Sequence, residues 1–160
     1  MGPLAWRAMS TTNMTANEKV VRDGYAIAER VDVEAFIAHF TPDGVFRNNG
    51  TGQEFRGRDV AIPLRVFATA FPDMHRELHR VYTTGDLVIV ELSLQGTHNG
   101  PMDLGMGILP PTAKRMDAPC CDVFTVKDGK IQVFNCYPSV FVMLWQLGAI
   151  PDLKGSLKTA

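Results

Sequence analysis

The sequence lacks the long runs of one residue type that mark several large classes of protein. No run of Lys and Arg exceeds two residues and the formal net charge is −1, which argues against a nucleic-acid partner because such a partner calls for a clustered basic surface. No apolar stretch approaches the ~18 residues of a membrane span. The first dozen residues lack the long apolar core of a secretory signal. We therefore expect a cytoplasmic protein with neither nucleic acid nor a membrane as its partner.

Cysteine is scarce, and its spacing excludes two further classes. The three cysteines are Cys120, Cys121 and Cys136; an odd number with two adjacent fits neither a disulfide framework nor a zinc motif. A reduced setting follows. The sequence also has no glycine-rich phosphate loop and no nucleophile elbow. No second histidine or cysteine lies beside His98 at ligand spacing. We expect no metal and no cofactor.

The 160 residues suffice for one domain, with 46% apolar and 21% charged residues, as in an ordinary globular protein. A domain of this length buries roughly two-thirds of its unfolded surface and needs no disulfide or metal to fold. We expect a flexible N-terminal extension over residues 1–16, the domain over residues 17–151 and a C-terminal tail over residues 152–160.

Helical periodicity appears in the first half of the chain and again at its end. Apolar residues at helical spacing predict a helix over Asn17–Arg30, and Asp32 caps a second through His39. Arg58–Phe71 is predicted as a third helix with Pro63 near its first turn. Val140–Leu147 is predicted as a last, short helix, with Gly148 as its stop.

The period changes to two after residue 73, which predicts strands. The predicted strands are Val45–Asn48, His75–Thr83, Leu87–Gln95, Lys114–Val126 and Lys130–Tyr137. Residues 50–57 are predicted as a polar connection. Two of the junctions are hairpin signals, at residues 84–86 and 127–130. Three helices followed by a run of antiparallel strands indicate an α+β domain, with the sheet curling over the helices.

One strand places a carboxyl group among apolar neighbours. Alternate residues of a strand share a face, so Cys120, Asp122, Phe124 and Val126 point the same way. Burial raises the pKa of a carboxyl group without a charged partner, and such a group is suited to general acid–base work on a carbon acid. The alternative is that the strand is twisted or at an edge and Asp122 meets water.

Residues Val20–Pro151 resemble the SnoaL-like polyketide cyclases of the NTF2-like superfamily. The resemblance lies in FATAFPDMHRELHRVYTTGDLVIVELSLQGTHNGP, in PPTAKRMDAPCCDVFTVKDGKI and in the closing MLWQLGAIP. It implies a conical, highly curved sheet closed by three helices around a deep apolar pocket. It also implies that Asp122, on the strand before the DGKI hairpin, is the general acid–base. Ketosteroid isomerases, more distant relatives, place an oxyanion-holding aspartic acid at this position.

The same resemblance suggests roles for three further polar residues. Tyr25 falls, with one gap, where ketosteroid isomerases carry their oxyanion-binding tyrosine. Asn48 stands in place of their basic aspartate; it cannot abstract a proton but can orient a ligand oxygen. His98 matches a histidine common in the family, expected near the acid as a second catalytic residue that shares the proton load. Each has a structural alternative: Tyr25 as a packing residue, Asn48 as part of a turn, and His98 as a strand-end residue.

Two departures from the family pattern concern the pocket. Residues 99–109 form a loop about four residues longer, rich in Gly and Met, which is suited to a lid or to reshaping the pocket mouth. Cys136-Tyr137-Pro138-Ser139 replaces a common Trp-Asp. The residues expected to contact the ligand, together with Tyr25 and Asn48, are Phe46, Phe67, Phe124, Tyr137 and Trp145. Trp145 has a packing role in the final helix as its alternative.

Three functions remain open on the sequence. The first is a cofactor-independent cyclase or isomerase that acts on an apolar, aromatic polyketide-like or steroid-like molecule. The second, an epoxide hydrolase of the limonene type, is disfavoured, because its Asp-Arg-Asp set is missing around Glu91 and Cys136, although Phe46 and Asn48 match part of its Tyr-x-Asn. The third is a non-catalytic binding or dimerisation domain, since a fold does not establish a function. A homodimer or tetramer is expected in each case.

Overall fold

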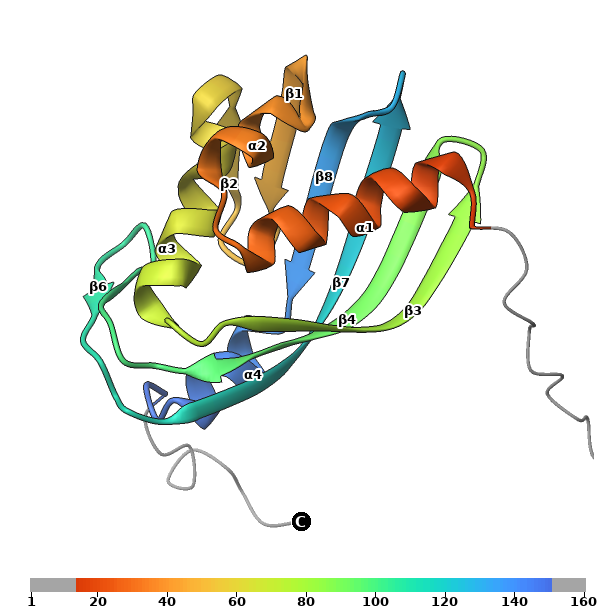
Figure 1. Ribbon diagram of the computed structural model, residues 1–160. Helices are drawn as coiled ribbons and strands as arrows, with labels where there is room; N and C mark the ends of the chain where they lie inside the picture. Colours follow the sequence, from red (N-terminus) through yellow and green to blue (C-terminus); the bar gives the residue numbers. More distant parts are fainter. Residues whose placement is uncertain (1–13, 151–160) are drawn as a thin grey trace, which may run out of the picture.

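A computed structural model describes residues 14–150 of the protein. The predictions for residues 1–13 of the extension and for the tail from residue 151 lie outside the described residues. Four α-helices and a short 3-10 helix accompany the strands (Figure 1). The helices are α1 (Ala16–Glu29), α2 (Val33–Ala38), η1 (Gly57–Ala61), α3 (Ile62–Ala70) and α4 (Val140–Gln146). Within residues 14–150 no helix is both long enough and apolar enough to cross a membrane.

Local signals in the sequence fix the ends of these helices. The Thr15 hydroxyl accepts a hydrogen bond from the Glu18 amide and caps α1, and Asp32 caps α2 by accepting from the Ala35 amide, as the sequence predicts. Pro63 lies in the first turn of α3, where its missing N–H costs nothing. Gly148, with a φ of 69°, follows α4 as its stop.

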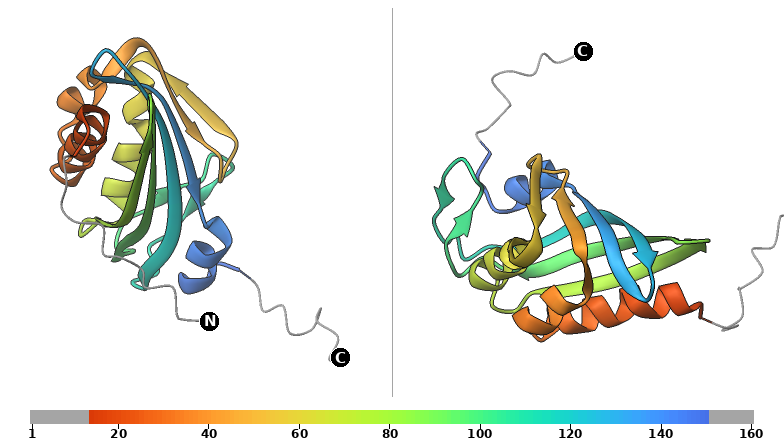
Figure 2. Two further views of the ribbon diagram at one scale, coloured as in Figure 1. Left: turned by 90° about the vertical axis from the view of Figure 1, so that its right-hand side faces the viewer. Right: turned by 90° about the horizontal axis from the view of Figure 1, so that it is seen from above.

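Six strands form one curved sheet in the order β2-β1-β8-β7-β4-β3, and two very short strands form a separate hairpin. The strands of the sheet are β1 (Phe40–Asn48), β2 (Gln53–Arg56), β3 (His75–Thr84), β4 (Leu87–Thr97), β7 (Arg115–Lys127) and β8 (Lys130–Pro138); those of the hairpin are β5 (Met102–Asp103) and β6 (Ile108–Leu109). Helices α1 and α3 lie on one side of the sheet and α4 on the other (Figure 2). The curved α+β architecture expected from the sequence is confirmed.

Two details of the sheet differ from the prediction. The polar connection contains a strand, β2, which pairs with β1 at the sheet edge and has mostly exposed side chains, so no buried alternation marked it. β1 pairs with β8 in parallel, whereas the other neighbours pair antiparallel. A parallel pair requires a long crossover, and everything between β1 and β8 in the chain supplies it.

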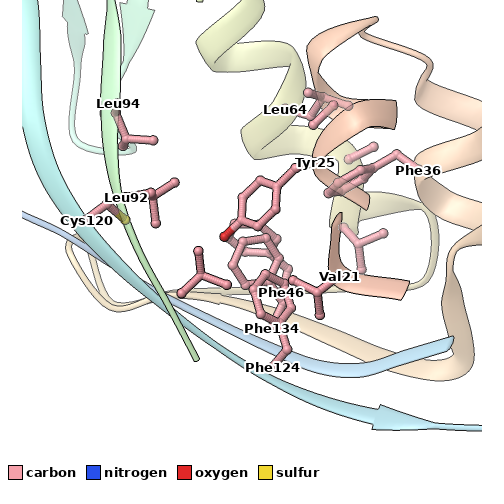
Figure 3. Close-up of a cluster of buried hydrophobic side chains, with 14 of the residues drawn as sticks. Val21, Tyr25, Phe36, Phe46, Leu64, Leu92, Leu94, Cys120, Phe124 and Phe134 are labelled. Atoms are coloured by element: carbon pink, nitrogen blue, oxygen red, sulfur yellow. The ribbon is translucent and has the colours of Figure 1, made fainter. Parts of the chain in front are cut away.

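The core lies between the concave face of the sheet and the helices. Three phenylalanines from adjacent strands form a row: Phe46 on β1 is opposite Phe134 on β8, which is opposite Phe124 on β7. The ring centroid of Phe134 lies 4.3 Å from the ring centroid of Phe46 and 4.3 Å from that of Phe124. Tyr25 of α1 meets Phe124 edge to face at 5.9 Å. Figure 3 shows its hydroxyl oxygen turned toward the strands that carry Leu92 and Cys120.

Candidate active site

Asp122 is a buried carboxyl group at the centre of the sheet. Along β7 buried and less buried residues alternate, which places Asp122 on the concave face with only 2% of its surface exposed. The Tyr25 hydroxyl donates a hydrogen bond to Asp122 Oδ2 at 2.6 Å, and the Cys120 thiol donates to Oδ1 at 3.3 Å. Both oxygens therefore have a partner, and helix α1 is tied to the sheet at this point.

The environment of Asp122 favours its protonated form. Burial raises the pKa of the Asp122 carboxyl above its ordinary value. Hydrogen bonds from Tyr25, Cys136 and Cys120 and the charge of Arg76 lower this pKa but act against the larger effect of burial. Burial and the Asp122 charge also raise the pKa of the Tyr25 hydroxyl well above its ordinary value. Tyr25 therefore stays a hydrogen-bond donor, and Asp122 holds its proton more tightly than a free carboxyl does.

Asp122 lies at the wall of an apolar cavity with about 690 Å³ of empty space, a volume that includes solvent at its open side. The three phenylalanines of the core row line it together with Phe67 of α3. Further lining residues are Val21, Gly24, Ala28, Phe36, Pro63, Leu64, Met74, Leu94, Ile131 and Pro138. A carboxyl group at the wall of an apolar cavity is suited to proton transfer with an apolar molecule.

A row of polar side chains crosses the sheet beside the row of phenylalanines. Asn48 on β1 is opposite Cys136 on β8, which is opposite Asp122 on β7, and all three line the cavity. Asn48 Oδ1 accepts a hydrogen bond from the Gly50 amide at 3.0 Å. This bond fixes the side chain and leaves Nδ2 to donate to a ligand oxygen.

Arg76 is a cavity residue that the sequence analysis missed. It lines the cavity with 12% of its side chain exposed, and its Nη1 lies 3.4 Å from Glu29 Oε1. Along β3, Arg76 is half-buried between the exposed residues His75 and Glu77. The alternation of the strand could have identified it, because Arg76 shares a face with the apolar Leu78.

His98 does not lie where the resemblance placed it. It is fully buried but is not among the residues that line the cavity. Its amide donates to the carbonyl of Lys114, which is eight residues from Asp122 on the chain, or about 26 Å along an extended strand. His98 Nδ1 accepts from the Thr112 amide at 3.3 Å, and Nε2 has no partner among the described residues. Burial lowers the pKa of His98.

The predicted ligand-binding residues divide into two groups. Tyr25, Asn48, Phe46, Phe67 and Phe124 line the cavity.

Tyr137 and Trp145, which were expected to contact the ligand, do not line the cavity. Tyr137 follows the inward Cys136 on β8 and therefore points to the other face, with 49% of its surface exposed. Trp145 lies on α4, on the far side of the sheet from α1 (Figure 2), and is 67% exposed.

The longer loop forms the β5–β6 hairpin and borders a second cavity of about 610 Å³. Residues 102–105 of the hairpin line this cavity, and Asn48, Pro63, Phe67 and Pro138 line both cavities. The loop is anchored at its start, where the amides of Asn99 and Gly100 donate to the carbonyl of Ala70. The hairpin thus lies beside the cavity that Asp122 lines, which is the position expected of a lid or of a segment that reshapes the cavity mouth.

Comparison with known proteins relates the chain to one family. The family model of the SnoaL-like domain matches residues 21–134. A proposed SnoaL-like polyketide cyclase from Jannaschia sp. CCS1 has a TM-score of 0.73 at 21% identity, with 85% of this chain and 94% of that chain covered. IdmH, a proposed polyketide cyclase from Streptomyces antibioticus, has a TM-score of 0.69 at 25% identity, with 82% of this chain and 98% of that chain covered. An LEH-like epoxide hydrolase of M. tuberculosis has a TM-score of 0.62 at 22% identity, with 82% of this chain and 89% of that chain covered. No curated protein matches.

The matched segment contains the acid and most of its surroundings. Residues 21–134 include Tyr25, Asn48, Arg76 and Asp122, and they end just before Cys136. The neighbours that share the fold include a proposed cyclase and an epoxide hydrolase, so the fold by itself does not select a reaction. On the family match over these residues, the chain belongs to the SnoaL-like family.

Proposed function

We propose that the protein is an enzyme that moves a proton on an apolar ketone through Asp122, without a cofactor. The observation that carries the proposal is the burial of the Asp122 carboxyl, 2% exposed, at the wall of a cavity of about 690 Å³ lined mainly by apolar side chains. The substrate class is an aromatic polyketide-like or steroid-like molecule, and the reaction is an enolisation or an aldol-type ring closure. The chemistry takes place in a reducing, cytoplasmic setting.

In the first step, the Asp122 carboxylate accepts a proton from a carbon next to a substrate carbonyl, which leaves an enolate. Because burial raises the pKa of Asp122, its carboxylate is a stronger base than that of a free aspartate. Either Asp122 then returns the proton to a different carbon of a delocalised enolate, or the enolate carbon attacks a second carbonyl of the same molecule. In ring closure, Asp122 returns the proton to the new alkoxide.

Two groups at the cavity wall can stabilise the developing negative charge, and a third can hold the substrate. The Tyr25 hydroxyl, which donates to Asp122 at 2.6 Å, can turn to a substrate oxygen once ligand is bound. Arg76 supplies a positive charge at the cavity wall. Asn48 lies two strands from Asp122 in the same row, about 10 Å away at the usual strand spacing, and holds an oxygen remote from the reacting carbon. Fixed donors of this kind lower the barrier to enolate formation.

The competing function is a binding or dimerisation domain without chemistry. An aspartate on a filled or collapsed cone would favour it, whereas Asp122 lines an open cavity. Epoxide hydrolysis has less support, because Cys136 stands in the polar row where a second acid would be needed, and the half-buried Glu91 faces away from the buried neighbours on its strand.

The test is deuterium exchange into 2-tetralone, a bicyclic ketone whose α-protons are acidic. Metal-free protein in D₂O is expected to accelerate the exchange, followed by NMR. Asp122→Asn is expected to reduce the acceleration about 10²–10⁴-fold, the usual contribution of a general base. Cys121→Ser is the matched control, because Cys121 adjoins Asp122 on β7 but faces the other side. Acceleration that is equal in Asp122→Asn would contradict the role of Asp122 as the base, and absent acceleration while 2-tetralone binds would support the binding-domain function instead.

A further inference from the structure

Two side chains at the wall of the cavity, Asp122 and Cys136, and the adjacent buried Cys120 form a compact set of candidate metal ligands. Cys120 Sγ, Cys136 Sγ and a carboxylate oxygen of Asp122 all lie within 4.8 Å of one another. The sheet holds them there: Asp122 and Cys136 are directly opposite on β7 and β8, and Cys120 is two residues from Asp122 on the same face. The spacing of the cysteines along the chain did not predict this cluster, because the pairing of β7 with β8 brings the three residues together.

The distances suit a tetrahedral ion. The two sulfur atoms are 3.7 Å apart, and Cys120 Sγ is 3.3 Å from Asp122 Oδ1. Bonds of about 2.3 Å to sulfur and about 2.0 Å to oxygen place two sulfur ligands about 3.8 Å apart, and a sulfur and an oxygen ligand about 3.5 Å apart. The two distances that involve Cys120 are therefore within a few tenths of an ångström of those of a bound ion, and the third, from Cys136 Sγ to Asp122, is at most 4.8 Å.

The ligand types select the class of cation. Two thiolates favour soft or borderline ions such as Zn²⁺, Cd²⁺ and Co²⁺. Mg²⁺ and Ca²⁺ require six or more oxygen ligands, and the cluster offers one carboxylate. Two thiolates and a carboxylate carry three negative charges against the two positive charges of the ion, which leaves a net charge of −1; the Arg76 guanidinium lies on the same cavity wall but is already paired with Glu29.

The surroundings resemble those of an open metal site. The Tyr25 hydroxyl holds Asp122 Oδ2 at 2.6 Å, which leaves Oδ1 beside the sulfur of Cys120; outer hydrogen bonds of this kind orient metal-binding carboxylates. Cys136 and Asp122 line the cavity, so the fourth coordination position faces the space where a ligand binds. Three protein ligands and one open position are the arrangement of reactive zinc sites.

We propose that Cys120, Asp122 and Cys136 bind a thiophilic divalent cation, with the fourth coordination position open to the cavity. This inference does not rest on the proposed function. The two compete for one group, because a carboxylate oxygen bonded to a cation no longer accepts a proton from a ketone. The cation would therefore inhibit proton transfer by Asp122.

The test is titration of reduced, metal-free protein with Co²⁺, followed by absorption spectroscopy. Wild type is expected to develop thiolate-to-cobalt charge-transfer absorption and the strong visible bands of tetrahedral cobalt, and one equivalent of Zn²⁺ is expected to abolish both. Cys136→Ser and Cys120→Ser are each expected to lose most of the charge-transfer intensity. Cys121→Ser, the matched control on the opposite face of β7, is expected to keep it.

Absence of charge-transfer absorption in folded wild type would overturn the assignment. So would a signal that survives Cys136→Ser, or one that disappears in Cys121→Ser. If one cysteine variant fails to fold, as judged by circular dichroism, the other variant and the Cys121→Ser control still decide the question. No ketone is present in this experiment, so its failure is distinguishable from failure of deuterium exchange into 2-tetralone.

Discussion

At the scale of single residues, the buried carboxyl of Asp122 links the proposed chemistry to the stability of the fold. Below about pH 3.9, the ordinary pKa of aspartate, the group is protonated in both the folded and the unfolded chain. As the pH rises, the unfolded chain loses this proton first, because burial raises the pKa in the folded protein. The contribution of Asp122 to stability is therefore present at low pH and is lost as the pH rises through the raised folded pKa.

Asp122→Asn is expected to remove this dependence. The free energy of unfolding of the variant minus that of wild type should increase with pH above about 3.9, by up to ~1.4 kcal/mol per pH unit. The increase should end once the pH passes the folded pKa. Urea unfolding of both proteins across a pH series measures the difference, in which other titrating groups largely cancel. A difference that stays flat or decreases with pH would mean that the pKa of Asp122 is not raised.

The residues of the site were predictable where strand alternation or the family pattern reached them. Alternation placed Asp122 and Phe124 on one face, and both line the cavity. The same rule could have placed Arg76 inside and Tyr137 outside. The pairing of Cys136 with Asp122 depends on the register of β8 against β7. The hairpin turn sets Lys127 opposite Lys130, and an irregularity between Thr125 and Val126 then shifts the pairing by one residue, a shift that the turn signal does not encode.

At the scale of elements, His98 fastens the segment that leads to and from the β5–β6 hairpin. Its amide donates to the Lys114 carbonyl, its carbonyl accepts from the Ala113 amide, and its ring stacks on Phe71 with centroids 5.2 Å apart. Because the ring is buried, the pKa of His98 is lowered, which favours the neutral form. These contacts indicate a structural role for His98, at a distance from the acid.

His98→Ala is therefore expected to lower stability and leave the chemistry in place. Removal of a buried ring costs about 2–5 kcal/mol, measured by urea unfolding, and hydrogen exchange at the Thr112 and Ala113 amides should accelerate. Deuterium exchange into 2-tetralone should remain close to the wild-type rate. The opposite pattern, full stability with loss of ketone exchange, would place His98 in the proton transfer.

The elements themselves were largely predictable because each carries a local signal. Thr15, Asp32, Pro63 and Gly148 mark helix ends by their own chemistry. Strand β2 has no such signal, because its side chains are mostly exposed and its pairing with β1 alone holds it in the sheet. The first half of β1 was missed for a different reason. Pro42, Asp43 and Gly44 are typical of a turn, yet they lie within the strand.

At the scale of the whole molecule, we propose that a second copy of the chain covers the outer face of the sheet. Tyr82, Ile89 and Val123 are directly opposite one another on β3, β4 and β7. Ile89 lies between the buried residues Val88 and Val90, so this row points away from the core. Tyr82 is 49% exposed. The row runs inward from the edge strand β3 near the β3–β4 turn, and an apolar row on an open sheet face is suited to a two-fold symmetric interface.

Ile89→Glu is expected to convert the dimer to a monomer while the fold is retained, because position 89 does not face the core. Sedimentation velocity should give twice the chain mass for wild type and one chain mass for the variant. Lys127→Glu, at the hairpin end of the same sheet, is the control and should remain dimeric. A wild-type protein that sediments as a monomer at micromolar concentration would rule out this interface.

The most direct test of the whole account is an NMR titration of the Asp122 side-chain carboxyl in reduced, metal-free protein, with Asp122→Asn to assign the signal. We predict a pKa above the ordinary ~3.9 of aspartate. We also predict a further rise in Tyr25→Phe, because the hydrogen bond from Tyr25 lowers the pKa. A pKa at or below the ordinary value would mean that Asp122 is solvated or paired with a positive charge, and would contradict its role as the proton-transferring group.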